Sequence, residues 1–133
     1  MEKFFTILEV NKELERLDEK FKTIQRTKAE ITKIGVFIQK NESMDQPLQE
    51  HLSLKRKMNH AMAELYKLIA EFEDTGAVIK SVDQGLVDFP SKRFGNDVWL
   101  CWKIGETEVK FWHEKNEGFN GRKPLETDDE LLV

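Results

Sequence analysis

Three polar side chains stand among apolar residues in the last third of the chain, and their types could bind a ligand. Asp88 lies between Val87 and Phe89, while His113 follows two aromatic residues and Arg122 ends a glycine-rich turn. A carboxylate in an apolar strand needs a partner, because burying an unpaired charge is costly. We therefore expect Asp88 and Arg122 to form an internal ion pair. The alternative is that Arg122 clamps the carboxylate or phosphate of a ligand.

A metal site is the second kind of chemistry that these residue types could support. His113 and Glu114, followed by Glu117, resemble the start of the zinc-protease motif HExxH, but the second histidine is missing and the segment predicts a strand. Asp88, Glu108 and His113 could still hold a divalent ion, since carboxylates and imidazole suit several metals. The other two histidines fall on a predicted helix. We expect the protein to bind no metal.

Cys101 is the one cysteine of the chain, and nothing in the pattern brings a basic residue close to it. A structural, half-buried thiol is therefore favoured over a nucleophile. The sequence contains no GxSxG elbow, no glycine-rich phosphate loop and no dinucleotide fingerprint. We expect no catalytic residue and no cofactor, which weighs against an enzyme.

The elements that must position these residues begin with a long helix over residues 7–39. Thr6 and Glu9 form a capping box, which marks its start. Apolar residues then follow a 4-3 spacing, as in a coiled coil, with two faults at Lys28 and Gly35. The predicted seam consists of Val10, Leu14, Leu17, Phe21, Ile24, Lys28, Ile31, Gly35 and Ile38.

A second helix is predicted over residues 48–75, between Pro47 and Gly76, which favour a helix start and a helix end. The short connection between two long helices predicts an antiparallel hairpin. The apolar face of the second helix is wider than one partner helix covers, so either the β half or another subunit must cover the rest. Its main stripe is Leu54, Met58, Ala61, Leu65, Leu68 and Phe72, and its second stripe is Leu52, Met62, Tyr66 and Ile69.

The rest of the chain predicts short antiparallel strands over residues 77–82, 86–89, 98–104 and 107–114. A tight turn at Gly105 and Glu106 would join the last two strands, because a glycine in the first central position suits a type II′ hairpin. This turn pairs Leu100 with Phe111 and Trp99 with Trp112. One face of the sheet would then carry Trp99, Cys101 and Trp112, and the other face Leu100, Trp102, Phe111 and His113.

The overall prediction is an α+β fold, in which a long, coiled-coil-like antiparallel helical hairpin precedes a small antiparallel β-sheet. The 133 residues have room for one domain over 1–125, with the hairpin in 1–76, the β module in 77–125 and an acidic, frayed tail in 126–133. No apolar run is long enough to span a membrane. The first residues lack the apolar core of a signal peptide, and one cysteine fits a reducing compartment, so we expect a cytoplasmic protein.

Charge is distributed unevenly along the predicted hairpin. The net charge of -4 weighs against a dedicated nucleic-acid binder. Residues 20–57 contain nine basic and four acidic side chains, whereas residues 1–19 contain three and six, and residues 58–76 one and four. Folding the hairpin places the basic stretch at its distal end and both acidic stretches at its base. The alternatives are an ordinary solvated surface, which is favoured, and a tip that docks on something acidic: an RNA, an anionic membrane or the base of another copy.

Several short motifs resemble the small bacterial family catalogued as domain of unknown function 2203. They are GLVDFP at 85–90, LCW at 100–102, FWHE at 111–114 and GFNGRKPL at 118–125. The resemblance implies a bacterial cytosolic origin but no activity. At the start the family more often has an acid where this chain has Leu8. The positions that match the family's signature are Asp88, Trp102, Glu106, Trp112, His113, Glu114 and Arg122.

Two functions remain open from the sequence. The first is a non-enzymatic interaction or scaffold protein that forms a homodimer through its hairpin. It could also bind another protein partner. The alternative is a small-ligand or metal-binding protein, possibly an enzyme, with a polar pocket in the β module. The two differ in whether the polar side chains converge on each other or on open space. The residues of that alternative pocket are Asp88, His113, Glu114, Arg122, Trp102 and Trp112.

Overall fold

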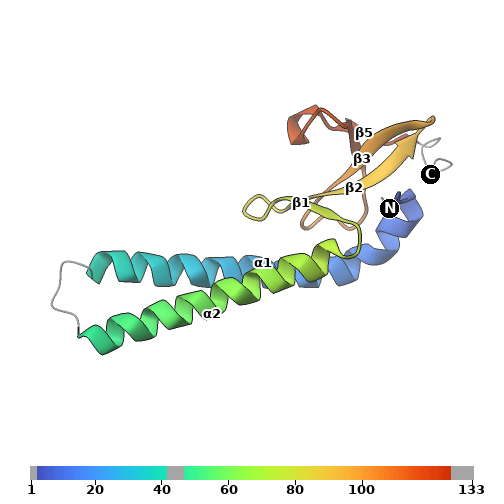
Figure 1. Cartoon of the computed structure of the whole chain (residues 1–133). Coiled ribbons are helices and arrows are strands. Elements are labelled where there is room, and N and C mark those ends of the chain that lie inside the picture. Colours follow the sequence, from blue (N-terminus) through green and yellow to red (C-terminus); the bar gives the residue numbers. More distant parts are fainter. Residues whose placement is uncertain (1–2, 42–46, 127–133) are drawn as a thin grey trace.

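The computed structural model describes residues 3–41 and 47–126. Two long helices are followed by a five-stranded antiparallel sheet, which confirms the predicted α+β class (Figure 1). Apart from Glu126, the predicted acidic tail lies outside the described residues. No helix in the described part of the chain is long and apolar enough to cross a membrane.

Helix α1 spans Ile7–Asn41 and begins at the predicted capping box. The Thr6 amide donates a hydrogen bond to the Glu9 carboxylate, and the Glu9 amide donates one to the Thr6 hydroxyl, each over 3.1 Å. The seam of α1 is buried as predicted up to Ile24, and further along Ile34 takes the buried position expected for Gly35. The buried side chains of α1 are Ile7, Val10, Leu14, Leu17, Phe21, Ile24, Ile34 and Ile38.

Helix α2 spans Leu48–Glu73 and runs back along α1, so that the two form an antiparallel hairpin (Figure 1). Pro47 precedes its first turn, and Gly76, at φ +101°, follows its last. Although all of α2 is described, Phe72 is the only one of its side chains that is buried. The hairpin projects well beyond the sheet, so its distal part has only the two helices to cover each other (Figure 1).

The sheet is a simple meander in the order β1-β2-β3-β4-β5. Phe94 and Gly95 join β2 to β3 with φ values of 51° and 81°, as a two-residue type I′ turn requires. The sequence did not predict β5. The strands span Val78–Ser81 (β1), Leu86–Arg93 (β2), Asn96–Lys103 (β3), Phe111–Glu114 (β4) and Lys123–Pro124 (β5).

The register between β3 and β4 differs from the predicted one by a single residue. Leu100 pairs with Trp112 rather than with Phe111, and Cys101 pairs with Phe111. A shift of one residue moves every side chain of a strand to the opposite face. Trp112 therefore joins Leu100 on the face toward the helices, whereas His113 and Phe111 join Cys101 on the other face.

The shift arises because the connection between β3 and β4 is longer than a tight hairpin. The Glu106 amide closes a turn onto the Lys103 carbonyl over 3.0 Å, but the chain then leaves the ladder until residue 111. In that interval the Val109 amide donates to the Asn11 side chain on α1 over 2.8 Å, and Val109 is buried in the core. A contact with α1 thus takes the place of strand pairing.

The core lies between the base of the hairpin and one face of the sheet. The Phe21 ring of α1 meets the rings of Phe72 and Trp102 edge to face, with centroids 5.7 and 6.4 Å away. Phe5 meets Phe89 of β2 in the same way at 5.3 Å. The opposite face of the sheet points away from the helices and carries the polar residues that the sequence singled out.

We predict that Thr6→Ala destabilises the fold by about 1 kcal/mol, because it removes the oxygen that accepts from the Glu9 amide. Urea unfolding measures this. The Thr6 amide and hydroxyl lower the pKa of Glu9, so its carboxylate stabilises the fold above its ordinary pKa and loses this effect as the pH falls through the lowered value. The penalty of Thr6→Ala should therefore shrink in acid. Thr32→Ala, inside α1, is the control and should cost almost nothing; an equal loss in both variants would contradict a capping role.

Candidate functional site

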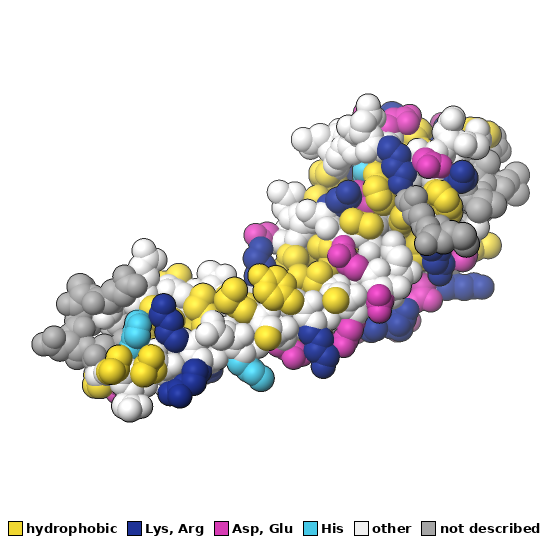
Figure 2. Space-filling view, viewed as in Figure 1, with side chains coloured by type: hydrophobic (Ala, Val, Ile, Leu, Met, Phe, Trp, Pro, Cys, Tyr) yellow, Lys and Arg dark blue, Asp and Glu magenta, His cyan; other side chains and the backbone are white. Residues whose placement is uncertain are grey.

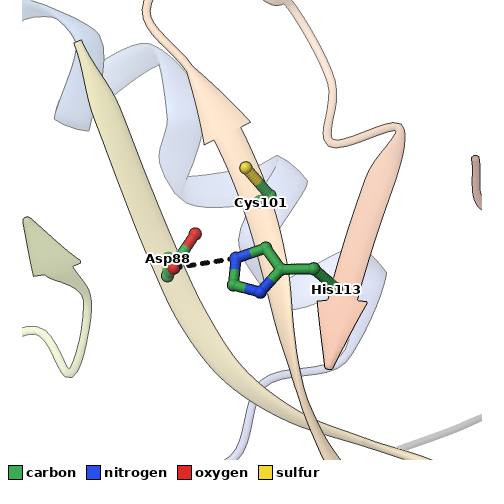
Figure 3. A group of neighbouring side chains, drawn as sticks. All are labelled: Asp88, Cys101 and His113. Carbon is green, nitrogen blue, oxygen red and sulfur yellow. Dashed lines mark hydrogen bonds and ion pairs between the residues drawn. The ribbon is translucent and has the colours of Figure 1, made fainter. Parts of the chain in front are cut away.

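Three side chains from neighbouring strands meet on the face of the sheet away from the helices. Asp88 of β2 lies opposite Cys101 of β3, and His113 projects from β4 toward Asp88 (Figure 3). All three residues are buried. Their oxygen, sulfur and nitrogen atoms lie within 4.8 Å of one another. We call these residues the Asp–Cys–His cluster.

Asp88 and His113 form a direct, buried pair. His113 Nε2 lies 2.9 Å from Asp88 Oδ2, and the two side chains are only 2% and 4% exposed. His113 Nδ1 lies 2.9 Å from the Glu114 carbonyl oxygen, which can only accept, so Nδ1 carries a proton. A single further proton is therefore shared between Nε2 and Oδ2. Burial raises the pKa of the Asp88 carboxyl, and the neighbouring His113 opposes this rise.

Asp88 and Arg122 do not form the predicted pair. Arg122 instead forms a fork with Glu106, with Nη2–Oε2 and Nη1–Oε1 distances of 3.1 and 3.5 Å. Its guanidinium also lies over the rings of Phe111 and Phe119, with centroid distances of 3.8 and 4.4 Å. The prediction was wrong because the register shift gives Asp88 a histidine partner and turns Phe111 toward Arg122.

Two hydrogen bonds from the end of β3 hold Glu106 in place. The Lys103 amide donates to Glu106 Oε1 over 2.7 Å, and the indole of Trp102 donates to the Glu106 carbonyl over 2.8 Å. Because Trp102 is fully buried in the core, this loop links the core to Arg122 on the outer face. Glu106 is one of the positions that match the family's signature, but the spacing of residues predicted for it only a place in a tight turn.

Cys101 lies between the two polar groups. The Cys101 sulfur accepts a hydrogen bond from Arg122 Nη1 over 3.8 Å. The same sulfur lies within 4.8 Å of the Asp88 carboxylate oxygen and the His113 ring nitrogen. Burial raises the pKa of the thiol to about 11, so it is protonated at neutral pH. This is the opposite of what an activated nucleophile needs. The thiol is buried rather than half-buried as expected, and Arg122 lies beside it although the sequence pattern brought no basic residue close.

The remaining residues of the alternative pocket are placed elsewhere. Trp102 and Trp112 belong to the core on the helix side of the sheet. The Glu114 side chain points toward Lys123, 3.8 Å away, and only its backbone carbonyl reaches His113. The sequence missed Cys101 as a member of the site, and only the correct strand register could have revealed it.

A cavity of about 180 Å³ opens beside the Asp–Cys–His cluster. Asp88 and Cys101 form part of its wall, and the segment before Arg122 covers it. Its lining residues are Lys80, Leu86, Asp88, Cys101, Glu117, Gly118 and Phe119. The Glu117 carboxylate accepts from the Glu114 amide over 3.2 Å and from Lys123 over 3.3 Å, and both contacts lower its pKa. The side chains of the Asp–Cys–His cluster thus contact each other, and two of them, Asp88 and Cys101, also line the cavity.

Residues 3–125 match the family model described as "Uncharacterized conserved protein (DUF2203)". The chain belongs to this family. The match confirms the resemblance drawn from the motifs of the β module, and it includes the hairpin, the sheet and every residue of the Asp–Cys–His cluster. No curated protein and no solved structure matches the chain significantly.

We predict strong coupling between Asp88 and His113. Asp88→Ala and His113→Ala should each lower the free energy of unfolding by about 3–5 kcal/mol, because each leaves the other buried polar side chain without its partner. The double variant should lose clearly less than the sum. Denaturant unfolding of all four proteins gives the coupling. Lys92→Gln breaks an exposed pair with Asp97 and is the control, expected to cost about 0–1 kcal/mol. Strictly additive losses at Asp88 and His113 would refute the pairing.

We further predict that Arg122→Lys is not a conservative change. The ammonium group loses the fork to Glu106 and the flat stacking on two aromatic rings, which should lower the free energy of unfolding by about 1–2 kcal/mol. Hydrogen exchange should accelerate in residues 115–122. Lys123→Arg, at an exposed ion pair, is the matched control. Unchanged exchange in the Arg122 variant would show that the positive charge alone holds this segment.

Proposed function

We propose that this protein is a non-enzymatic interaction protein that forms an antiparallel homodimer through its helical hairpin. The observation that carries the proposal is the open apolar face of α2. In its two predicted stripes, Phe72 is buried, Leu52 and Tyr66 are exposed, and the other side chains are half-buried in the single chain. Two antiparallel hairpins can close into a four-helix bundle, which covers apolar faces of this width.

The second stripe of α2 supports the proposal. Leu52 and Tyr66 are 43% and 65% exposed, while Ile69, nearest the sheet, already packs against the core. The β half therefore covers only one end of the stripe. Figure 2 shows hydrophobic side chains along the visible face of the hairpin, well beyond the sheet. A second copy would remove this surface from water.

Charge supports an antiparallel arrangement of the two copies. Residues 20–57 carry a net charge of +5, from nine basic and four acidic side chains. The two stretches at the base, 1–19 and 58–76, each carry -3, from three basic against six acidic and one against four. Figure 2 shows Lys and Arg near the distal end and most Asp and Glu nearer the sheet. Antiparallel association brings opposite charges together, whereas parallel association stacks like charges.

The polar residues of the β module support a structural rather than a catalytic role. Arg122 and Glu106 tie the outer face of the sheet to the Trp102 loop, and the thiol of Cys101 is protonated. A single, buried cysteine also fits a protein of the reducing bacterial cytosol. On this proposal the sheet holds the hairpin base together while the hairpin binds its partner.

We predict a dimer in sedimentation equilibrium at both 0.1 M and 1 M salt. The dimer should weaken slightly at the higher salt, because the Debye length falls from about 10 Å to about 3 Å. The salt then screens the attraction between the basic distal end of one hairpin and the acidic base of the other. The double variant Leu52→Glu/Tyr66→Glu should be a monomer, since it places charge in the apolar interface.

The control is Leu8→Glu, which changes a leucine that is 64% exposed, close to the 65% of Tyr66, on the first turn of α1, where an acid is favourable. This variant should remain a dimer. A wild-type protein that stays at 15.6 kDa at high concentration in low salt would refute the proposal.

A further inference from the structure

We propose that Asp88, Cys101 and His113 form a binding site for a zinc-like divalent metal ion. One sulfur, one imidazole nitrogen and one carboxylate oxygen are a ligand set that zinc accepts, and catalytic zinc sites combine three protein ligands with one open position. Here the three atoms lie within 4.8 Å of one another and come from three adjacent strands. The inference is independent of dimer formation, because the cluster lies on the sheet rather than on the hairpin.

The orientation of His113 is the one that a metal ligand needs. Its Nδ1 donates to the Glu114 carbonyl, which directs Nε2 into the cluster. Metal-ligating histidines characteristically donate their other ring N–H to a carbonyl or a carboxylate, which fixes the tautomer and the ring plane. The ring therefore needs no reorientation to bind an ion at Nε2 (Figure 3).

Only small movements separate the cluster from tetrahedral geometry. Zinc bonds of about 2.0–2.3 Å place neighbouring ligand atoms roughly 3.3–3.8 Å apart. The distance from His113 Nε2 to Asp88 Oδ2 would open from 2.9 Å by a few tenths of an ångström. The Cys101 sulfur, which is at most 4.8 Å from the other ligand atoms, would move inward by at most about 1.0–1.5 Å.

The charges of the site balance when the ion is bound. Two protons leave: the one shared by Asp88 and His113, and that of the Cys101 thiol. The carboxylate and the thiolate then neutralise the divalent ion. Two cations border the site: Lys80 lines the cavity, and Arg122 contacts the sulfur. The fork to Glu106 compensates Arg122, whose N–H is placed to stabilise a thiolate.

The cavity beside the cluster provides the open position. At about 180 Å³ it has room for water or a small ligand, and Asp88 and Cys101 are among its lining residues. Glu117 also lines the cavity, but its carboxylate accepts from the Glu114 amide and from Lys123, so water is the expected fourth ligand. The expectation of no metal rested on the missing second histidine and on the strand predicted around His113. The conceivable metal group included Glu108, which is exposed, and the observed fold places Cys101 beside Asp88 and His113 instead.

The test is a titration of the reduced, full-length chain with Co²⁺, followed by competition with Zn²⁺. We expect one Co²⁺ per chain at micromolar or tighter affinity, a thiolate-to-cobalt charge-transfer band in the near ultraviolet, and intense visible bands typical of tetrahedral cobalt. Zn²⁺ should displace the ion and raise the melting temperature, since it binds only the folded chain. Absence of binding in this titration would overturn the proposal.

Variants test whether the metal ion binds to the Asp–Cys–His cluster or to other side chains. Cys101→Ser should abolish the charge-transfer band and weaken binding by more than about 100-fold, a larger loss than removing a residue that only hydrogen-bonds to a ligand. Arg122→Gln should weaken it by about 10–100-fold. The control His51→Ala/His60→Ala removes both histidines of α2 and should bind as the wild type. Folding of each variant is checked by tryptophan fluorescence, with Cys101→Ala as a second, smaller replacement. Binding that survives in both folded Cys101 variants, or that is lost in the α2 control, would refute the site.

Discussion

Val98 pairs with Glu114 and Cys101 with Phe111 along the β3–β4 ladder, and most features of the β module depend on this register. It places Trp112 in the core and His113 on the outer face beside Asp88. The register follows from the long connection before β4, which Asn11 of α1 and the indole of Trp102 hold through hydrogen bonds. A helix side chain and a core tryptophan therefore decide which polar groups meet on the far side of the sheet.

The exposed apolar surface belongs to the hairpin, and the polar clusters belong to the outer face of the sheet. The base of the hairpin and one face of the sheet share a core of aromatic and branched side chains. Beyond that core the hairpin projects with an apolar face that its own chain leaves half open (Figures 1 and 2). The outer face of the sheet, by contrast, satisfies its buried polar groups internally, through Asp88 with His113 and Arg122 with Glu106. Association and metal binding are thus proposed for separate parts of the chain.

Both helices could be predicted from the sequence because their signals are local, whereas the tight turn expected at Gly105 and Glu106 was wrong. The capping box at Thr6, the breaker at Gly76 and the spacing of apolar residues act within a few positions of one another. The pairing of Asp88 could not be predicted in this way. Its apolar flanks correctly indicated a buried carboxylate, but the sequence pointed to Arg122, 34 positions away, and not to the observed partner His113, 25 positions away.

The sequence by itself determined the α+β class, the helical hairpin, the family and the uneven charge of the hairpin, since these follow from composition and short-range periodicity. Only the tertiary structure decided the face on which each β4 side chain lies. A strand alternates with a period of two, so one extra residue in the preceding loop inverts the whole strand. That residue is accommodated by a contact between Asn11 and Val109, 98 positions apart, which no local pattern encodes.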